Sequence, residues 1–327
     1  MRVLVLGGTG FVGRAVVDEA LARGDDVTTL NRGHQPAVKG VTAVVGDRLH
    51  QGLDGLAGEW DVVVDTWSAA PYAVRDAATL LTARAQRYVY VSSRSVYADP
   101  VVAGAAEDAP VVDASPDDGG DVDYARAKRG GELAAVAAFG DRAVLARAGL
   151  ILGPYEDVGR LPWWLTRIAR GGPVLAPGPR DLPLQYVDAR DLARWLLDVD
   201  TGGAYNVVSP PGHASMEELL TAGVAATGSD ARLRWFSPDE LLAEGVQPWT
   251  ELPVWLPPGP LHDFLHRGDV TRALATGLTC RPVQETVADT WSWLRSIGGA
   301  APQRPDRPAV GLDPAVESRL LAAHPDR

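Results

Sequence analysis

A glycine-rich segment near the start of the chain constrains its fold more than any other feature. Gly7, Gly10 and Gly13 stand between an apolar stretch, Val3–Leu6, and a stretch with helical spacing of apolar residues, Phe11–Arg23. Glycines so spaced allow a tight turn, a close approach of the backbone to a pyrophosphate and close helix–strand packing. The helix would also direct its free N–H groups at anionic phosphates. We therefore predict a dinucleotide-binding unit, with a ligand-free glycine turn as the alternative.

The first half of the chain alternates strand-like and helix-like segments, which is typical of a parallel sheet covered by helices on both faces. The valines at 62–64 are apolar on both faces, as a buried parallel strand requires. We expect strands at Val3–Leu6, Val27–Leu30, Val41–Val45, Val62–Asp65, Tyr88–Ser92 and Ala143–Arg147. The predicted fold class is α/β, a doubly wound Rossmann sheet.

After Gly149 the sequence becomes richer in Pro, Gly and Trp. We expect a Rossmann domain over residues 1–155, completed by segment 184–208. Segments 156–183 and 209–300 would form a smaller, mostly helical substrate-binding lobe, and residues 301–327 a C-terminal extension. Within these segments we expect a strand at Tyr205–Val208 and helices at Ser215–Ala225, Pro238–Ala243, Pro282–Leu294 and Val316–Ala323.

Charge and composition exclude several classes of protein. The formal net charge of −11 argues against a nucleic-acid partner, because neutralising phosphates requires clustered Lys and Arg. It also disfavours anionic membrane surfaces. The longest apolar runs fall short of the roughly 20 residues of a membrane span, and the chain opens on a strand, so we expect neither a membrane anchor nor a signal peptide. The single cysteine, Cys280, is expected to be a small buried side chain, and it fits a reducing, cytoplasmic location.

The end of the second expected strand bears on the choice of cofactor. Folds selective for NAD place an acid there to bind the ribose 2′-OH, whereas this chain has Asn31 followed by Arg32. Without the acid nothing repels a 2′-phosphate, and a guanidinium can hold one through two hydrogen bonds. We expect NADP(H) to be preferred, with NAD(H) as the alternative.

The third expected strand is followed by Asp47 and Arg48, at the place where the adenine ring should rest. Asp47 could accept a hydrogen bond from the adenine amino group while Arg48 stacks on the ring. A simple turn with an Asp–Arg pair is the alternative.

Tyr124 and Lys128 form the most informative pair in the chain. Residues four apart lie on one face of a helix, so the two side chains can converge on one ligand. A neighbouring ammonium favours the phenolate, which suits a general acid or base. The spacing alone is common. Apart from Lys39, however, the other Lys and Arg positions of the chain are all Arg, so a lysine four residues after a tyrosine is improbable by chance. A Tyr–Lys pair without chemistry is the alternative.

A serine cluster, Ser92, Ser93 and Ser95, follows the fifth expected strand. Parallel sheets of this kind bind ligands at the carboxyl ends of their strands. A hydroxyl at that edge can stabilise charge that develops on a substrate oxygen. We choose Ser93 for this role, and expect Ser92 and Ser95 to be structural or to contact the cofactor.

Taken in order, these motifs resemble the short-chain dehydrogenase/reductase superfamily, and within it the extended group, the NAD-dependent epimerase/dehydratase family. The motifs are the glycine segment 7–13, Val-Ser-Ser-Arg-Ser-Val-Tyr at 91–97, Tyr124 with Lys128, and Tyr-Val-Asp-Ala-Arg-Asp-Leu-Ala at 186–193. The resemblance implies that Ser93, Tyr124 and Lys128 form the catalytic triad. Tyr124 would exchange a proton with a substrate hydroxyl or carbonyl, and Lys128 would also bind the nicotinamide ribose.

The same resemblance, together with the strand ends, gives a set of expected cofactor contacts. They are Gly7, Thr9, Gly10, Phe11, Val12, Gly13, Asn31, Arg32, Asp47, Arg48, Thr66, Trp67 and Lys128. Thr66 and Trp67 follow the fourth strand, near the expected nicotinamide position. The resemblance also allows a homodimer that pairs through the helices flanking Tyr124.

Departures from the family's patterns narrow the chemistry. Sugar-nucleotide 4,6-dehydratases carry acids directly after the catalytic hydroxyl, where Arg94 and Ser95 stand here. UDP-sugar epimerases place an Asn soon after the sixth strand, where segment 148–154 has none, and an Arg for the diphosphate where Leu184 and Gln185 stand. Arg180 lies nearby as a substitute. These absences weaken a nucleotide-sugar substrate without eliminating it.

The second half of the chain holds most of the tryptophans, and most of these are expected in the core. Trp67, Trp163 and Trp164 are the candidates for an aromatic substrate pocket. His262 and His266 share helical spacing but lack a third ligand, so we expect surface histidines and no metal site.

The leading hypothesis is an NADP(H)-dependent oxidoreductase that acts on a carbonyl or alcohol of a small organic metabolite. The second is a redox-neutral epimerase that retains its cofactor. The third is a non-catalytic, dinucleotide-sensing regulator or an RNA-binding protein, which the Tyr–Lys pair and the negative charge both disfavour.

Overall fold

Seven parallel strands form the central sheet of the computed structural model, which describes residues 1–50, 52–300, 303–304 and 308–324. The strand order is β11-β6-β5-β4-β1-β2-β3, and every neighbouring pair is parallel. The strands are β1 (Arg2–Leu6), β2 (Asp26–Asn31), β3 (Thr42–Val45), β4 (Trp60–Asp65), β5 (Ala85–Ser93), β6 (Ala143–Ala148) and β11 (Gly203–Val207). The order reverses direction beside β1, at the site where doubly wound sheets bind their ligands.

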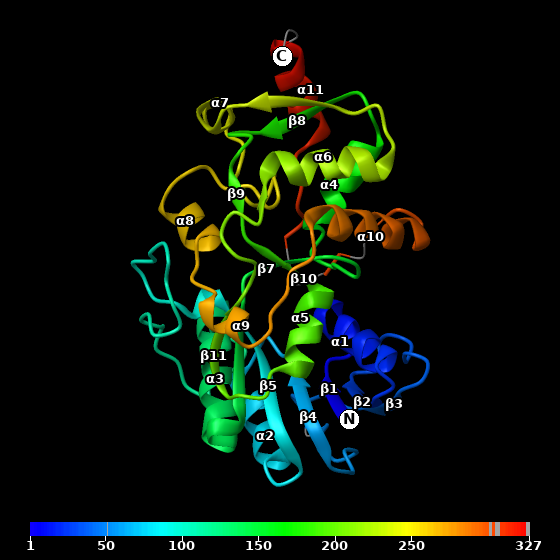
Figure 1. The fold of residues 1–327 in the computed structure, drawn as a ribbon, viewed down its shortest axis with the longest axis vertical. Coiled ribbons are helices and arrows are strands. Elements are labelled where there is room, and N and C mark those ends of the chain that lie inside the picture. The colour runs from blue at the N-terminus through cyan, green and yellow to red at the C-terminus, as the bar shows by residue number, and fades with distance from the viewer. Residues whose placement is uncertain (51, 301–302, 305–307, 325–327) are drawn as a thin grey trace.

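Helices cover both faces of this sheet, so the predicted fold class is confirmed (Figure 1). On one face, α1 (Phe11–Ala22) packs beside α5 (Ala189–Asp198) over a core of valines and alanines. On the other face, α2 (Pro71–Leu81) packs beside α3 (Tyr124–Phe139). A Cβ at Gly131 of α3 would lie 2.4 Å from the Tyr90 hydroxyl, so this glycine lets α3 approach β5 closely.

A second lobe stands over the carboxyl edge of the sheet (Figure 1). It is mostly helical, as expected, and buries its own core around Trp164, Trp255 and Phe236. Its larger helices are α4 (Arg160–Ala169), α6 (Met216–Thr227), α10 (Val283–Ser296) and α11 (Pro314–Ala323). The short helices are α7 (Pro238–Ala243), α8 (Pro260–His266) and α9 (Thr271–Ala275).

Among the described residues, three two-stranded sheets accompany these helices, and none of them was expected from the sequence. Parallel β8 (Pro173–Pro177) and β13 (Arg232–Phe236) pair in the lobe, and antiparallel β9 (Pro183–Leu184) and β12 (Ala214–Ser215) pair below them. Parallel β7 (Leu150–Leu152) and β10 (Tyr186–Asp188) lie where the chain passes between the sheet and the lobe. Each pairing joins segments that are far apart in the sequence, so no local sequence pattern predicts it.

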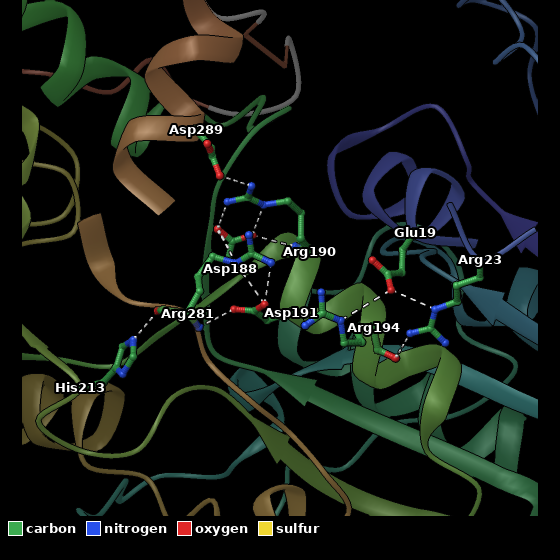
Figure 2. Close-up of polar contacts among 9 residues, drawn as sticks. All are labelled: Glu19, Arg23, Asp188, Arg190, Asp191, Arg194, His213, Arg281 and Asp289. Atoms are coloured by element: carbon green, nitrogen blue, oxygen red, sulfur yellow. Dashed lines mark hydrogen bonds and ion pairs between the residues drawn. The ribbon is translucent and has the colours of Figure 1, made fainter. Parts of the chain in front are cut away.

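A network of ion pairs ties the lobe to α5 (Figure 2). Arg281 donates to Asp191 at 2.8 Å and lies 3.7 Å from Asp188. Arg190 contacts Asp188 at 2.8 Å and also pairs with Asp289 of α10. Burial opposes ionisation of Asp188, but the hydrogen bonds from Arg190 outweigh it and lower the pKa of that carboxyl. Asp188 is fully buried, so loss of its arginine partners would leave its charge uncompensated. The network joins α5 to Arg281 and, through the half-exposed Asp289, to α10.

The described helices include none with both the length and the apolar character needed to cross a bilayer.

Candidate active site

The glycine turn between β1 and α1 has the shape of a phosphate cradle. Gly7 adopts φ 104°, which disfavours any residue with a side chain. A Cβ at Gly13 would lie 1.9 Å from the Gly7 carbonyl oxygen, so α1 reaches the turn only because residue 13 is glycine. A Cβ at Gly10 would meet nothing within 4 Å, which leaves open space at the N-terminus of α1. Phe11 and Val12, both half-buried, form the first turn of that helix. These features fit a bound pyrophosphate.

The end of β2 lies beside this turn. The Thr9 hydroxyl donates to Asn31 Oδ1 at 3.3 Å, which joins the two segments expected to bind the adenosine half. Arg32 is exposed, and no ion pair or hydrogen bond to another described residue holds its guanidinium. A cavity of about 280 Å³ opens between the turn and residues 35–39, and its lining includes Thr9, Arg14 and Lys39. No role was expected of Lys39, although lysine is rare in this chain.

Arg48 does not lie where an adenine ring could stack on it, so that expectation is wrong. Its guanidinium is buried and donates to both Asp65 oxygens, at 2.6 and 2.8 Å, and to the Ala73 carbonyl at 2.6 Å. The alternative of a local Asp–Arg pair is also wrong, because the partner is on β4. Asp47 accepts from the Leu49 amide at 3.0 Å and shapes the turn after β3. Sequence reasoning failed here because the buried carboxylate that attracts Arg48 comes from another strand.

Thr66 and Trp67 follow β4 and line the same edge. The Thr66 hydroxyl donates to the Leu6 carbonyl at 3.0 Å, beside the glycine turn. The Trp67 ring is half-buried, with the Arg48 guanidinium 5.0 Å from its centre. The Trp67 carbonyl accepts from Lys128 Nζ at 2.6 Å and from the Tyr90 hydroxyl at 3.1 Å. Trp67 therefore contributes its backbone to the placement of Lys128.

Tyr124 and Lys128 occupy one face of the first turns of α3, which Asp123 caps. Lys128 is 3% exposed, and its ammonium also donates to the Val91 carbonyl at 2.7 Å. The ammonium lies 4.9 Å from the centre of the Tyr90 ring and 6.0 Å from that of Tyr124. Tyr124 is 38% exposed, so its phenol can meet a ligand from solvent.

Ser93 ends β5 and begins a short 3₁₀ turn, η1 (Arg94–Val96), which packs against α3. Its Oγ accepts from the Ser95 amide at 3.1 Å and donates to the Ser95 hydroxyl at 3.1 Å. Lys128 donates to Val91, two residues before Ser93 on the same strand. Hence β5 and α3 bring the three proposed catalytic residues to one edge of the sheet.

Sequence reasoning missed a buried ionic network behind these residues. Glu132, one turn beyond Lys128 on α3, accepts from the Ser92 hydroxyl at 2.7 Å. It pairs with Arg147 of β6 through two hydrogen bonds, at 2.8 and 3.0 Å, and with Arg129 at 2.9 Å. The i, i+4 spacing of Lys128 and Glu132 was visible in the sequence, but the partner on β6 was not. The network locks α3, β5 and β6 together.

Two of the three aromatic pocket candidates lie away from this edge. Trp164 is 1% exposed and donates to the Pro253 carbonyl, so it is a core residue and not a pocket wall. Trp163 lines a cavity of about 500 Å³ between α4 and a set of residues that includes Gly299, Gln303 and 310–314, and this lining shares no residue with the dinucleotide edge. Trp67 alone stands beside the expected site.

The expectation of surface histidines is also wrong. His262 and His266 are 2% and 0% exposed, and their ring centres are 4.8 Å apart in α8. Among the described residues no group of His, Cys, Asp and Glu has a geometry suited to a metal ion.

Gln185, which stands where UDP-sugar epimerases place an arginine for the diphosphate, is buried, whereas the suggested substitute Arg180 is exposed. Arg180 lies over the Trp235 ring and donates to Glu217 at 3.4 Å. Gln185 is fully buried, and its amide bonds the Ser209 carbonyl and both backbone groups of Gly268.

With this geometry established, comparison with known proteins identifies the family. A family model described as the NAD dependent epimerase/dehydratase family matches residues 3–207. The chain belongs to this family. The resemblance expected from the motifs is therefore confirmed.

This NAD-dependent epimerase/dehydratase family member is also similar to individual known proteins in sequence and in structure. The Epimerase family protein SDR39U1 of Bos taurus is 31% identical over 259 residues, covering 71% of this chain and 82% of that protein. The enzyme WbmH of Bordetella bronchiseptica, solved with NAD+, superposes with a TM-score of 0.64 at 20% identity, covering 91% of this chain and 99% of that one. UDP-glucose 4-epimerase of Thermotoga maritima, solved with UDP-glucose, superposes with a TM-score of 0.60 at 18% identity and the same coverage. At such identities the two structures establish a shared fold alone.

Proposed function

We propose that this family member is an NADP(H)-dependent oxidoreductase that acts on a carbonyl or alcohol group of a small organic metabolite, with Ser93, Tyr124 and Lys128 as its catalytic residues. The observation that carries the proposal is the buried Lys128 ammonium, fixed by two carbonyl oxygens next to the accessible Tyr124 phenol. With Lys128 fixed beside it, the Tyr124 phenol would be the group that exchanges a proton with the substrate.

The bound dinucleotide would supply or accept the hydride. In the reductive direction, Tyr124 would give its hydroxyl proton to the substrate oxygen as negative charge develops there. Ser93 would donate a second hydrogen bond to the same oxygen. Lys128 would hold the nicotinamide ribose while its charge stabilises the Tyr124 phenolate. In the oxidative direction the phenolate would take the proton back.

The preference for NADP(H) rests on the basic side chains around the end of β2. Arg32 is exposed and has no protein partner among the described residues, and Lys39 and Arg14 line the neighbouring cavity. Arg14 also pairs with Asp18 at 2.9 Å, so Arg32 and Lys39 are the cations that favour a 2′-phosphate over a bare ribose hydroxyl here.

A small substrate is favoured over a nucleotide sugar by the state of Gln185 and Arg180. A diphosphate carries two negative charges and needs cations to replace its hydration. Gln185 is uncharged and fully committed to backbone groups, so this position carries no cation, and the nearby Arg180 has a 61% exposed side chain and contacts Glu217 at 3.4 Å. We infer that the site accepts a substrate without a diphosphate.

A redox-neutral epimerase is the second candidate, favoured by the names of the relatives and structural neighbours. Absorbance at 340 nm separates the two. The purified protein is incubated with NADPH and a panel of small aldehydes and ketones, and separately with UDP-glucose. An oxidoreductase consumes NADPH with a carbonyl substrate, and it releases its nucleotide on gel filtration. Tightly retained nucleotide with no net absorbance change on any carbonyl would overturn the proposal in favour of the epimerase.

A further inference from the structure

The residue that follows the proposed catalytic serine points away from the cofactor edge and into the second lobe. Arg94 is 1% exposed, although Ser95 beside it is open to solvent. Its guanidinium donates to the carbonyl oxygens of Phe264 and Leu265, at 2.5 and 3.0 Å. It also lies 4.9 Å from the centre of the Phe264 ring. Arg94 thus joins the end of β5 to α8 across a gap of about 170 residues in sequence.

The carbonyls that Arg94 binds belong to the last turn of α8. The last carbonyls of a helix have no partner within the helix and carry its partial negative charge. A buried cation that donates to two of them acts as a C-terminal cap from another part of the chain. Arg94 is therefore a structural part of α8 as well as of η1.

A second set of contacts closes the same junction. Gln185 accepts from the Gly268 amide at 2.7 Å and donates to the Gly268 carbonyl at 3.0 Å. A Cβ at Gly268 would lie 2.4 Å from the Arg94 guanidinium carbon, so Gly268 packs directly on that group. The backbone N–H of Gln185 donates to His266 Nδ1 at 2.9 Å. Burial lowers the pKa of His266 to about 3, so its ring is neutral and can accept this bond.

No carboxylate of the described residues forms an ion pair with Arg94. Burial lowers the pKa of Arg94 to about 10, and its Nε has no hydrogen-bond partner. Such a group costs stability, and an apolar side chain of similar length would fill the space at lower cost. What an apolar residue could not do is hold the two carbonyls and, through them, fix the turn that bears Ser93.

That turn needs outside support. A 3₁₀ segment of three residues is not stable alone in water. Inside η1, Arg94 and Val96 are buried and Ser95 is exposed, and the Val96 carbonyl accepts from the Val112 amide at 2.8 Å, so the turn is held through its first and last residues. The Ser95 amide donates to Ser93 Oγ, and this bond exists only while the turn is formed.

We propose that Arg94 is a positioning residue, which anchors η1 to α8 and thereby holds the Ser93 hydroxyl toward the cofactor edge. The role of Ser93 rests on the proposed function, whereas the anchoring does not. The substrate-binding lobe then sets the geometry of a residue on the Rossmann sheet.

The test compares Arg94→Met and Arg94→Lys with a control at the other end of β5. Arg87 is half-buried, donates to the Leu197 carbonyl at 2.9 Å and has an unpartnered buried Nε, so Arg87→Met removes a similar side chain from the same strand. The readout is the water-exchange rate of the Ser95 amide, measured by NMR with NADPH present. We expect Arg94→Met to raise this rate at least tenfold and Arg94→Lys to restore part of the protection, while Arg87→Met leaves it unchanged.

A milder variant covers the case in which Arg94→Met does not fold. Phe264→Leu removes the ring under the guanidinium and keeps the carbonyls, and it should raise the Ser95 exchange rate severalfold. Unchanged exchange in Arg94→Met, or in Phe264→Leu where Arg94→Met does not fold, overturns the proposal, and so does an equal rise in Arg87→Met. If the wild type turns over a carbonyl, kcat should fall at least tenfold in Arg94→Met with NADPH affinity unchanged. Absence of turnover in the wild type refutes the proposed function and leaves the exchange result to decide the anchoring.

Discussion

The Lys128 ammonium lies 6.0 Å from the centre of the Tyr124 ring, one turn away on α3. Hydrogen bonds to carbonyl oxygens of two different segments, after β4 and within β5, hold it in that position. A cation that the backbone fixes in this way loses little flexibility when a ligand binds. Because Lys128 is fixed beside Tyr124, replacing the Tyr124 phenol is the most direct test of the proposed catalytic mechanism.

Replacing Tyr124 by Phe removes the proton that the proposed chemistry requires and keeps the exposed ring. We expect kcat to fall by about 100-fold or more, as is usual for loss of a general acid. The NADPH dissociation constant should stay within about twofold. Tyr72→Phe on α2 is the control, and it should leave both constants unchanged. Turnover at the wild-type rate in Tyr124→Phe would remove Tyr124 from the mechanism.

Replacing Arg32 by Ala tests the choice of cofactor. The NADPH dissociation constant should rise about tenfold or more, since a charge-assisted hydrogen bond to phosphate is lost, while that of NADH changes little. Titration of intrinsic tryptophan fluorescence measures both. Arg2→Ala, at the opposite end of the sheet, should affect neither. Equal weakening of NADPH and NADH binding would show that Arg32 does not read the 2′-phosphate.

Replacing Glu132 by Gln tests the buried network behind the site. The Arg147 guanidinium would lose its counter-charge inside the protein, where it is 4% exposed. We expect the free energy of unfolding to fall by about 3 kcal/mol. Urea denaturation measures it. Glu19→Gln at the more exposed pair with Arg23 (Figure 2) should cost no more than about 1 kcal/mol. Equal losses in the two variants would contradict the importance assigned to burial.

Glu156 should make the stability of the protein depend on pH. Its carboxyl is fully buried and accepts from the amides of Arg160 and Leu161 at the start of α4. Burial raises the pKa of Glu156 to about 7 despite these bonds. The folded state therefore holds the proton more tightly than the unfolded state, and the free energy of unfolding decreases as pH rises from about 4.5 to 7.

Glu156→Gln removes this titration. The stability of the wild type relative to the variant should fall by roughly 1 to 3 kcal/mol between pH 5 and pH 8. Urea denaturation at both pH values measures the change, with the exposed Glu59→Gln as the control. A difference between wild type and Glu156→Gln that is constant with pH would show that Glu156 does not titrate in this range.

The single cysteine should react slowly in the folded protein. Cys280 is half-buried against the core under α5, and burial raises the pKa of its thiol to about 12. Because the thiolate is the reactive form, we expect its reaction with a disulfide reagent at pH 8 to be about 100-fold slower than in the urea-unfolded chain. Absorbance of the released thiol follows both. Similar rates would mean that Cys280 is accessible and poised for chemistry.

Local sequence determined the sheet, the glycine turn and the Tyr124–Lys128 pair. Strand runs, glycine spacing and the i, i+4 rule all act within a few residues, so they can be read along the chain. The tertiary structure decided the partners of the buried charges. Arg48 pairs with Asp65 and Glu132 pairs with Arg147, while Arg94 donates to a carbonyl oxygen near the end of α8. Each buried charge needs a partner, and the fold determines which group lies close enough to serve. Those groups lie on other strands and helices, at distances along the chain that no local pattern encodes.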